Sequence, residues 1–214
     1  MPDNAGSRVV LSSVGTKWND VVGEQHHFPG GELADVMFKQ HVIVVTVGHA
    51  ITCEFKKEGR FQHVFKARGA ISFFPSYQPF FLRLKVEKGM LANVLFLALD
   101  PAFVSRTAVG LELDSDHIEL VEQHGGTDPT LHHIAMALQT GVQTGGAVDR
   151  MYGEALSTAL TVHLLRKYGA AVPGPKKQHG GLPREKLVRA IEYIHSQAHG
   201  HCPCPCPNRN PCAS

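Results

Sequence analysis

The chain has 214 residues, 43% of them hydrophobic, which is enough for one packed domain and an additional segment. A formal net charge of +2 gives no overall electrostatic signature of a nucleic-acid-binding protein. The sequence contains neither a run of about 18 apolar residues nor an N-terminal signal-peptide pattern, so we exclude a membrane span and expect a cytoplasmic protein.

The first hundred residues predict β-structure. Val42 to Val47 is almost entirely β-branched, as in a buried strand. Further short apolar runs follow at close spacing, separated by turn residues: Ala50 to Phe55, Phe61 to Phe65, Ile71 to Phe74, Phe80 to Val86 and Leu91 to Leu99. About six short strands in this arrangement are typical of a β-barrel or a β-sandwich.

A helical pattern replaces the strands after about residue 100. Asp100-Pro101 and Asp128-Pro129 each combine a capping side chain with a proline that fits the first helical position. We predict helices from Ala102 to Val109, from Thr130 to about Thr140 and from about Val148 to Tyr168.

The third of these helices carries a seam of small and apolar residues that a partner helix could approach closely. The seam consists of Ala155, Leu156, Ala159, Val162 and Leu165. It predicts a homodimer interface, but the same stripe fits equally well against the outer surface of the barrel within one subunit. The sequence leaves both interpretations open.

The end of the chain predicts a linker and a helix without a partner. Val172 to Gly181 is rich in proline and glycine, as a linker is. Leu182 to Gln197 has an apolar stripe at helical spacing, with Pro183 in its first turn. No later apolar segment covers that stripe, and an isolated helix of this length is marginal in water.

Four segments together resemble the AraC-type transcription regulators. Phe65 to Pro75, with Gly69 as a turn glycine, is similar to the central strand–turn–strand of their barrel, and Leu97 to Phe103 to the segment that leaves it. Tyr152 to Tyr168 looks like the helix before their linker, and Leu182 to Gln197 like the first helix of their DNA-binding half. The order of the four segments carries the resemblance.

The resemblance implies an α+β protein: a cupin-like antiparallel β-barrel (a double-stranded β-helix) followed by an α-helical segment. It divides the chain into a sensor barrel (1–110), a helical dimerisation segment (111–171), a linker (172–181), the first helix of a truncated DNA-binding domain (182–198) and a disordered Cys/Pro tail (199–214). The barrel would sense a small-molecule effector or mediate dimerisation. Two helix-turn-helix units would bind DNA in an intact relative.

Only the first helix of the DNA-binding half has a counterpart here, so we expect no specific DNA binding from this chain. The codons of Cys202 to Asn208 permit Leu-Ser-Leu-Ser-Leu-Ser-Glu in another frame, as in intact family members. We therefore hypothesise a frameshift near Ser196 to His201. The Cys/Pro run could instead bind a soft metal, although its alternating prolines favour an extended, non-native tail.

Aromatic residues indicate the candidate ligand pocket. Phe73, Phe74, Phe80 and Phe81, with Trp18 as a further contributor, could line an apolar site or simply fill the barrel. Cys53 is predicted to be an inert core thiol without a neighbouring base.

We predict no enzymatic activity, no cofactor and no metal site. Metal-dependent cupins use a His-x-His pair that is missing from the strand region, where His41, His49 and His63 occur singly. We predict surface positions for the adjacent pairs His26-His27 and His132-His133, because the side chains of neighbouring residues point in different directions and rarely bind the same metal ion. The alternative function is a stand-alone cupin-like protein that binds a small molecule or a metal.

Overall fold

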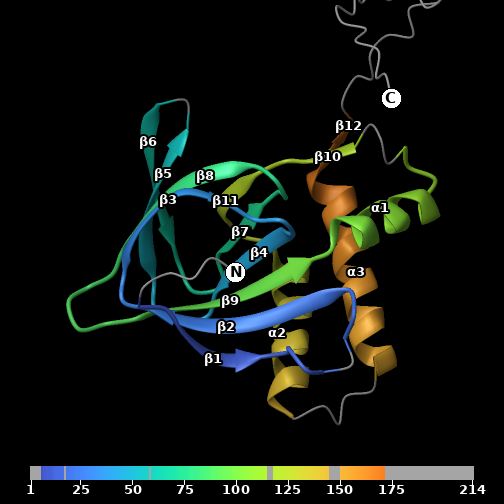
Figure 1. The fold of residues 1–214 in the computed structure, drawn as a ribbon, viewed down its shortest axis with the longest axis horizontal. Coiled ribbons are helices and arrows are strands. Elements are labelled where there is room, and N and C mark those ends of the chain that lie inside the picture. Colours follow the sequence, from blue (N-terminus) through green and yellow to red (C-terminus); the bar gives the residue numbers. More distant parts are fainter. Residues whose placement is uncertain (1–5, 17, 58, 115–117, 145–149, 172–214) are drawn as a thin grey trace, which may run out of the picture. The chain divides into compact units, whose positions relative to one another are not determined.

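The computed structural model describes residues 6–16, 18–57, 59–114, 118–144 and 150–171, which lie within one compact unit, Met1–Val172. Two antiparallel sheets face each other, and helices cover the far side of the larger sheet (Figure 1). The predictions for residues 172–214 lie outside the described part.

The larger sheet runs in the order β1-β2-β9-β4-β7-β11 and the smaller one in the order β3-β8-β5-β6. The strands of the larger sheet are β1 (Arg8–Ser12), β2 (Val21–Phe28), β4 (His41–Thr46), β7 (Ile71–Phe74), β9 (Ala92–Leu99) and β11 (Gln123–Gly126). Those of the smaller sheet are β3 (Gly31–Met37), β5 (Ile51–Lys57), β6 (Arg60–Lys66) and β8 (Pro79–Lys85).

The strand order identifies the architecture. From β2 to β9 successive strands alternate between the two sheets, except at the β5–β6 hairpin. The two ends of this series, β2 and β9, pair with each other. This is the jelly-roll topology that cupins share. The α+β prediction of a cupin-like barrel followed by helices is confirmed.

The central strands β4, β7 and β9 of the larger sheet are buried on both faces, because the barrel interior lies on one side and the helices on the other. All residues of β4 after His41 are buried, as its β-branched sequence predicts. β11 extends this sheet by pairing with β7, although it lies within the segment predicted to be helical. Position 125 of β11 requires a glycine for two reasons. Its φ is +68°, and because β11 lies close to β6, a Cβ added there would lie 2.4 Å from Val64 Cγ1.

Three helices follow the barrel: α1 (Pro101–Gly110), α2 (Pro129–Gln143) and α3 (Arg150–Tyr168). Both predicted caps are confirmed, since the Asp100 carboxylate accepts the Ala102 N–H at 2.7 Å and the Asp128 carboxylate accepts the Leu131 N–H at 3.1 Å. A short β10 (Ile118–Leu120) pairs with β12 (Gly169–Ala171) directly after α3. None of the described helices is both long and apolar enough to cross a membrane.

Candidate functional site: an apolar cavity inside the barrel

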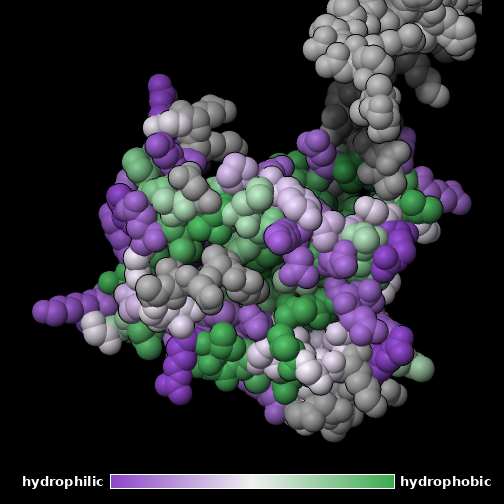
Figure 2. All heavy atoms as spheres, in the orientation of Figure 1, coloured by the Kyte–Doolittle hydropathy of each residue, from purple (hydrophilic) through white to green (hydrophobic). Residues whose placement is uncertain are grey.

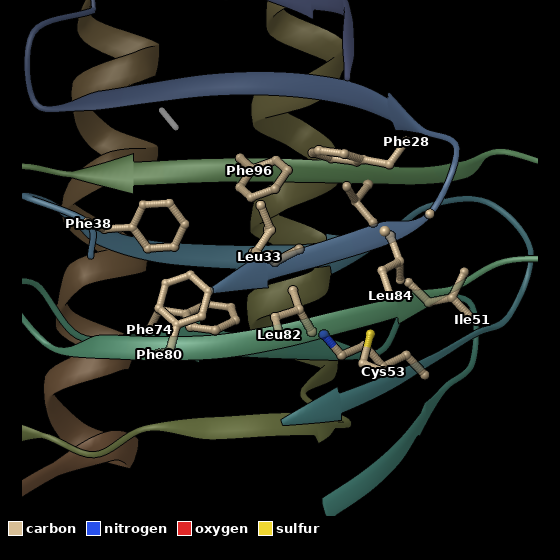
Figure 3. Close-up of a pocket in the computed structure, with 15 residues that line it drawn as sticks. Phe28, Leu33, Phe38, Ile51, Cys53, Phe74, Phe80, Leu82, Leu84 and Phe96 are labelled. Atoms are coloured by element: carbon tan, nitrogen blue, oxygen red, sulfur yellow. The ribbon is translucent and has the colours of Figure 1, made fainter. Parts of the chain in front are cut away.

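The candidate site is a cavity between the two sheets (Figure 3). The larger sheet contributes Phe28, Val44, Phe74, Val94 and Phe96; the smaller sheet contributes Gly31, Leu33, Ile51, Cys53, Lys66, Phe80, Leu82 and Leu84; Gly30 and Phe38 complete the lining. Only Lys66 and Cys53 among these residues carry a titratable side chain. The site is therefore an apolar chamber with one amine and one thiol.

The cavity is small, about 50 Å³. At about 10–15 Å³ for each water-sized centre, it has room for about three to five heavy atoms without movement of its walls. Leu33, Leu82 and Leu84 line the cavity and are only half-buried, so the cavity is partly open to solvent at the smaller sheet. Around the strands of the smaller sheet, Figure 2 shows small apolar areas at the surface between polar residues.

Lys66 is the last residue of β6, and its side chain is 3% exposed. Its Nζ atom lies 4.9 Å from the centre of the Phe55 ring and interacts with the thiol of Cys53. Burial lowers the pKa of the Lys66 amine from its ordinary value, and burial raises the pKa of the Cys53 thiol. Both shifts favour an uncharged amine beside an uncharged thiol.

No acidic side chain in the described part of the chain forms an ion pair with Lys66. The nearest acidic residue along β5, Glu54, follows Cys53 and points to the opposite face of the smaller sheet. There its carboxylate binds Arg83 at 3.0 Å, His63 at 3.3 Å and Lys85. The Glu54 carboxylate therefore forms its ion pairs outside the barrel, and no carboxylate lines the cavity beside the Lys66 amine.

Lys66 was not predicted as a site residue, because the alternation of apolar and polar residues along β6 indicates that Phe61 and Phe65, not Lys66, face the interior. Its aromatic residues Phe61 and Phe65 are 46% and 68% exposed, whereas Val64 and Lys66 point inward. A hydrophobic pattern alone predicts the opposite phase. The only signal for the true phase is the inward-pointing apolar set of the partner strand, in which Cys53 pairs with Val64.

The structure brings two of the four predicted pocket phenylalanines together. Phe74 and Phe80 line the cavity, with ring centroids 4.7 Å apart. Phe73 points to the other face of the larger sheet and contacts the Tyr168 ring from α3, at 6.3 Å. Phe81 lies on the outer face of the smaller sheet beside Phe61, so neither of these two reaches the cavity.

Trp18 does not contribute to the cavity. Its indole packs against Gly153 of α3, where an added Cβ would lie 2.3 Å from Nε1. It belongs to the helix-covered core, and the suggestion that it lines the pocket is corrected.

The predicted dimer seam divides between two faces of α3. Leu165 is buried in the core and Leu156 is half-buried against it. Ala155 and Ala159 are exposed and Val162 is half-buried. The face of α3 that packs on the barrel is instead formed by Gly153, Ser157, Leu160, Thr161, Leu164, Leu165 and Tyr168.

The cavity does not fit a metal ion, because its lining has neither imidazole nor carboxylate. Within the described ranges, no cluster of three His, Cys, Asp or Glu side chains could hold one. The surface position predicted for His26 is wrong: it is 5% exposed and lies between Ser7 Oγ at 3.1 Å and Glu24 Oε2 at 3.2 Å. Polar partners allow this burial.

The solved structures that are similar to this chain include an AraC-like regulator and cupin proteins. No family model and no curated protein matches it. The solved structure of the AraC-like transcriptional activator CuxR is similar at 13% identity and a TM-score of 0.47, over 83% of this chain and 60% of that one. A cupin domain from Bordetella pertussis is similar at 11% identity and a TM-score of 0.35, over 44% of this chain and 94% of that one.

The oxalate decarboxylase of Lactobacillus farciminis is also similar, at 12% identity and a TM-score of 0.35, over 51% of this chain and 37% of the enzyme. At such low scores these likenesses carry no argument about function. The prediction that the chain is not an enzyme is nevertheless corrected, because enzymes occur among the similar structures and this fold decides neither for nor against catalysis. The missing catalytic motifs therefore do not exclude catalysis.

Proposed function

We propose that residues 6–171 form the ligand-sensing domain of a cytoplasmic AraC-type transcription regulator, with the barrel cavity as its effector site. The observation that carries this proposal is the apolar cavity between the two sheets, whose chemistry suits a small and mostly apolar molecule. The order of barrel and helices, together with the sequence resemblance, supports the type of regulator.

Two apolar probes, xenon and benzene, test the cavity. Either probe should shift the methyl NMR signals of Ile51 and Leu82 and raise the Tm of the protein. Val94→Phe should fill the cavity and abolish both effects, whereas Val109→Phe, at a position 63% exposed on α1, should leave them unchanged. If neither probe shifts these signals in the wild-type protein, the cavity is not a ligand site and this proposal fails.

The regulator is proposed to form a homodimer through the outward face of α3. Ala155, Ala159 and Val162 leave this face open to close approach by a second copy of the helix. Ala159→Glu should then convert the dimer to a monomer in sedimentation experiments, while Val109→Glu on α1 should not. A wild-type protein that sediments as a monomer at all concentrations contradicts the dimer.

We further propose that the helix predicted at 182–198 opens a DNA-binding half and that the reading frame changes near Ser196 to His201. The test is the nucleotide sequence from the Leu187 codon to several hundred bases past Ser214. A second reading frame that continues into two helix-turn-helix patterns supports the regulator and the frameshift. If no frame does so, the alternative of a stand-alone cupin-like small-molecule-binding protein is favoured.

A further inference from the structure

The amine of Lys66 is the one reactive nitrogen that the described structure places in the cavity. Its side chain is held by the Phe55 ring on one side and by the Cys53 thiol on another. Any molecule that occupies the cavity therefore lies within reach of this nitrogen. A lysine placed this way is available for chemistry as well as for binding.

Three observations favour the uncharged form of the amine. The side chain is 3% exposed, its neighbours are apolar apart from one thiol, and no described carboxylate pairs with it. Desolvation without a counter-ion disfavours the ammonium and lowers the pKa of Lys66. An uncharged amine has a free electron pair, which makes it a nucleophile toward carbonyl carbon.

We infer that Lys66 forms a reversible imine with a small apolar aldehyde; this inference rests on the proposed role of the cavity as the effector site. The Lys66 nitrogen attacks the carbonyl carbon, and a proton moves from nitrogen to oxygen to give a carbinolamine. The hydroxyl group then leaves with a second proton from nitrogen as one molecule of water. A C=N bond remains, and nothing is oxidised or reduced.

Cavity size and polarity select the aldehyde. A carboxylic acid would bring a second charge into an apolar chamber and would require the charged amine, which burial disfavours. An aldehyde is uncharged, and so is its imine. The volume of about 50 Å³ limits the ligand to about five heavy atoms unless the half-buried leucines move. Butanal has this size.

The experiment treats the full chain with butanal and sodium cyanoborohydride at pH 7, then locates butylated lysines by peptide mass spectrometry. Lys66 should be modified about tenfold faster than exposed lysines such as Lys39 and Lys88. Lys66→Arg has a similar length and cannot form an imine, so the fast modification should disappear, although its guanidinium brings a permanent charge into the cavity. Lys39→Arg is the matched control and should leave the rate at Lys66 unchanged.

Lys66→Met serves as a second variant, and circular dichroism checks that each variant is folded. Two results overturn the inference: Lys66 stays unmodified, or all lysines react at similar rates. If Lys66 is unmodified while xenon or benzene still binds, the imine is refuted and the proposed effector site stands. If no probe enters the cavity either, both proposals fail.

Discussion

Burial controls the charge of two side chains on opposite faces of the barrel wall. Lys66 lies inside the cavity without an acidic partner, and its pKa is lowered by desolvation. His41, at the start of β4, accepts the backbone N–H of Ser76 at its Nδ1 atom, at 3.1 Å. Burial lowers the pKa of His41 to about 4. Burial favours the uncharged form of each side chain in the folded state, so each makes the free energy of unfolding depend on pH.

Lys66→Met should stabilise the protein at pH 7 by about 1–3 kcal/mol, because it removes a buried amine and keeps an unbranched chain. In the unfolded chain the amine keeps its proton up to its ordinary pKa of 10.5, whereas the folded state releases it at lower pH. Wild-type stability therefore rises with pH below 10.5, and the advantage of the variant should shrink. Urea unfolding at pH 7 and pH 9.5 measures this difference; a constant difference contradicts a desolvated amine.

His41→Asn should remove a loss of stability on acidification. Unfolded His41 takes up a proton near pH 6.5 and the folded residue only near pH 4, so wild-type stability falls as the pH drops between these values. The loss amounts to at most about 3 kcal/mol. Asn can accept the Ser76 N–H without titrating. Thermal unfolding from pH 7 to pH 4 compares the two proteins; parallel curves would exclude His41 as the cause.

At the scale of elements, one carboxylate joins two helices. Asp128, which is 2% exposed, caps α2 through the Leu131 N–H. Its Oδ2 atom accepts hydrogen bonds from the Tyr168 hydroxyl at 2.9 Å and from His163 at 2.8 Å, and Lys167 lies 2.9 Å away. Burial opposes the charge, but these hydrogen bonds outweigh it and hold the pKa of Asp128 below its ordinary value. The C-terminal end of α3 is thereby fixed to the N-terminal end of α2.

Asp128→Ala should lower the free energy of unfolding at pH 7 by about 2–4 kcal/mol, because it removes the cap and several charged hydrogen bonds. Asp128→Asn should cost less, since asparagine also caps helices. Tyr168→Phe deletes one hydrogen bond and should cost about 1–2 kcal/mol. Urea unfolding ranks the three variants; an Asn variant as unstable as the Ala variant would assign the effect to charge rather than capping.

The contact between α3 and the segment before β2 depends on a glycine. The higher helix propensity of alanine in Gly153→Ala should stabilise the protein by about 1 kcal/mol. The new methyl group would overlap Trp18, however, and this overlap should destabilise the protein by about 1–3 kcal/mol. We expect a lower Tm and a shifted fluorescence maximum, which reports on Trp18 because it is the only tryptophan in the chain. Gly110→Ala in α1 is the control, since nothing lies within 4 Å of its added Cβ. Equal Tm values for the two variants would contradict this contact.

Elements with a clean local pattern were predictable from the sequence. The apolar strands β4, β5, β7, β8 and β9 and the two Asp-Pro helix starts agree with their predictions. β2 was missed because it combines Gly23, Glu24 and His26, which the pattern of apolar residues does not mark as a strand; Ser7 and Glu24 satisfy His26 in the fold. β11 has no apolar residue, and only its pairing with β7 makes it a strand.

The candidate site was predictable in part, because local sequence patterns indicate which neighbouring residues point to opposite faces of a strand. Alternation along β7 and β8 fixes that Phe73 and Phe74, and likewise Phe80 and Phe81, point to opposite faces. It does not say which member of each pair faces the cavity. Lys66 lay beyond prediction, because its inward position follows from the pairing of β6 with β5 rather than from any local signal.

At the scale of the whole molecule, the larger sheet separates the cavity from the helices. Phe74 contributes to the cavity, and Phe73, its neighbour on β7, packs against Tyr168 of α3. A ligand that displaces the Phe74 ring would therefore act on the same short strand that supports α3. The proposed dimer face lies on this helix. The architecture thus gives the proposed effector site a short physical connection to the proposed interface.

The boundary of the domain follows from where the last strand pairs. β12 pairs with β10 through Ala171 and Gly169, and the compact unit ends at Val172. A chain shortened to end at Val172 should keep the Tm of the full chain within about 2 °C, a change of about 0.5–1 kcal/mol. This result would support the predicted linker at 172–181, whereas aggregation or a much lower Tm would place the boundary further along the chain.

A chain shortened to end at Leu165 is the matched comparison. It loses β12 as well as Lys167 and Tyr168, which bind the buried Asp128 carboxylate. Because a buried carboxylate without its partners is costly, we expect this chain to melt at least about 6 °C lower. Differential scanning calorimetry of the two shortened chains measures the contribution of the seven residues from Arg166 to Val172. Equal Tm values would mean that the junction of α2 and α3 does not depend on Asp128.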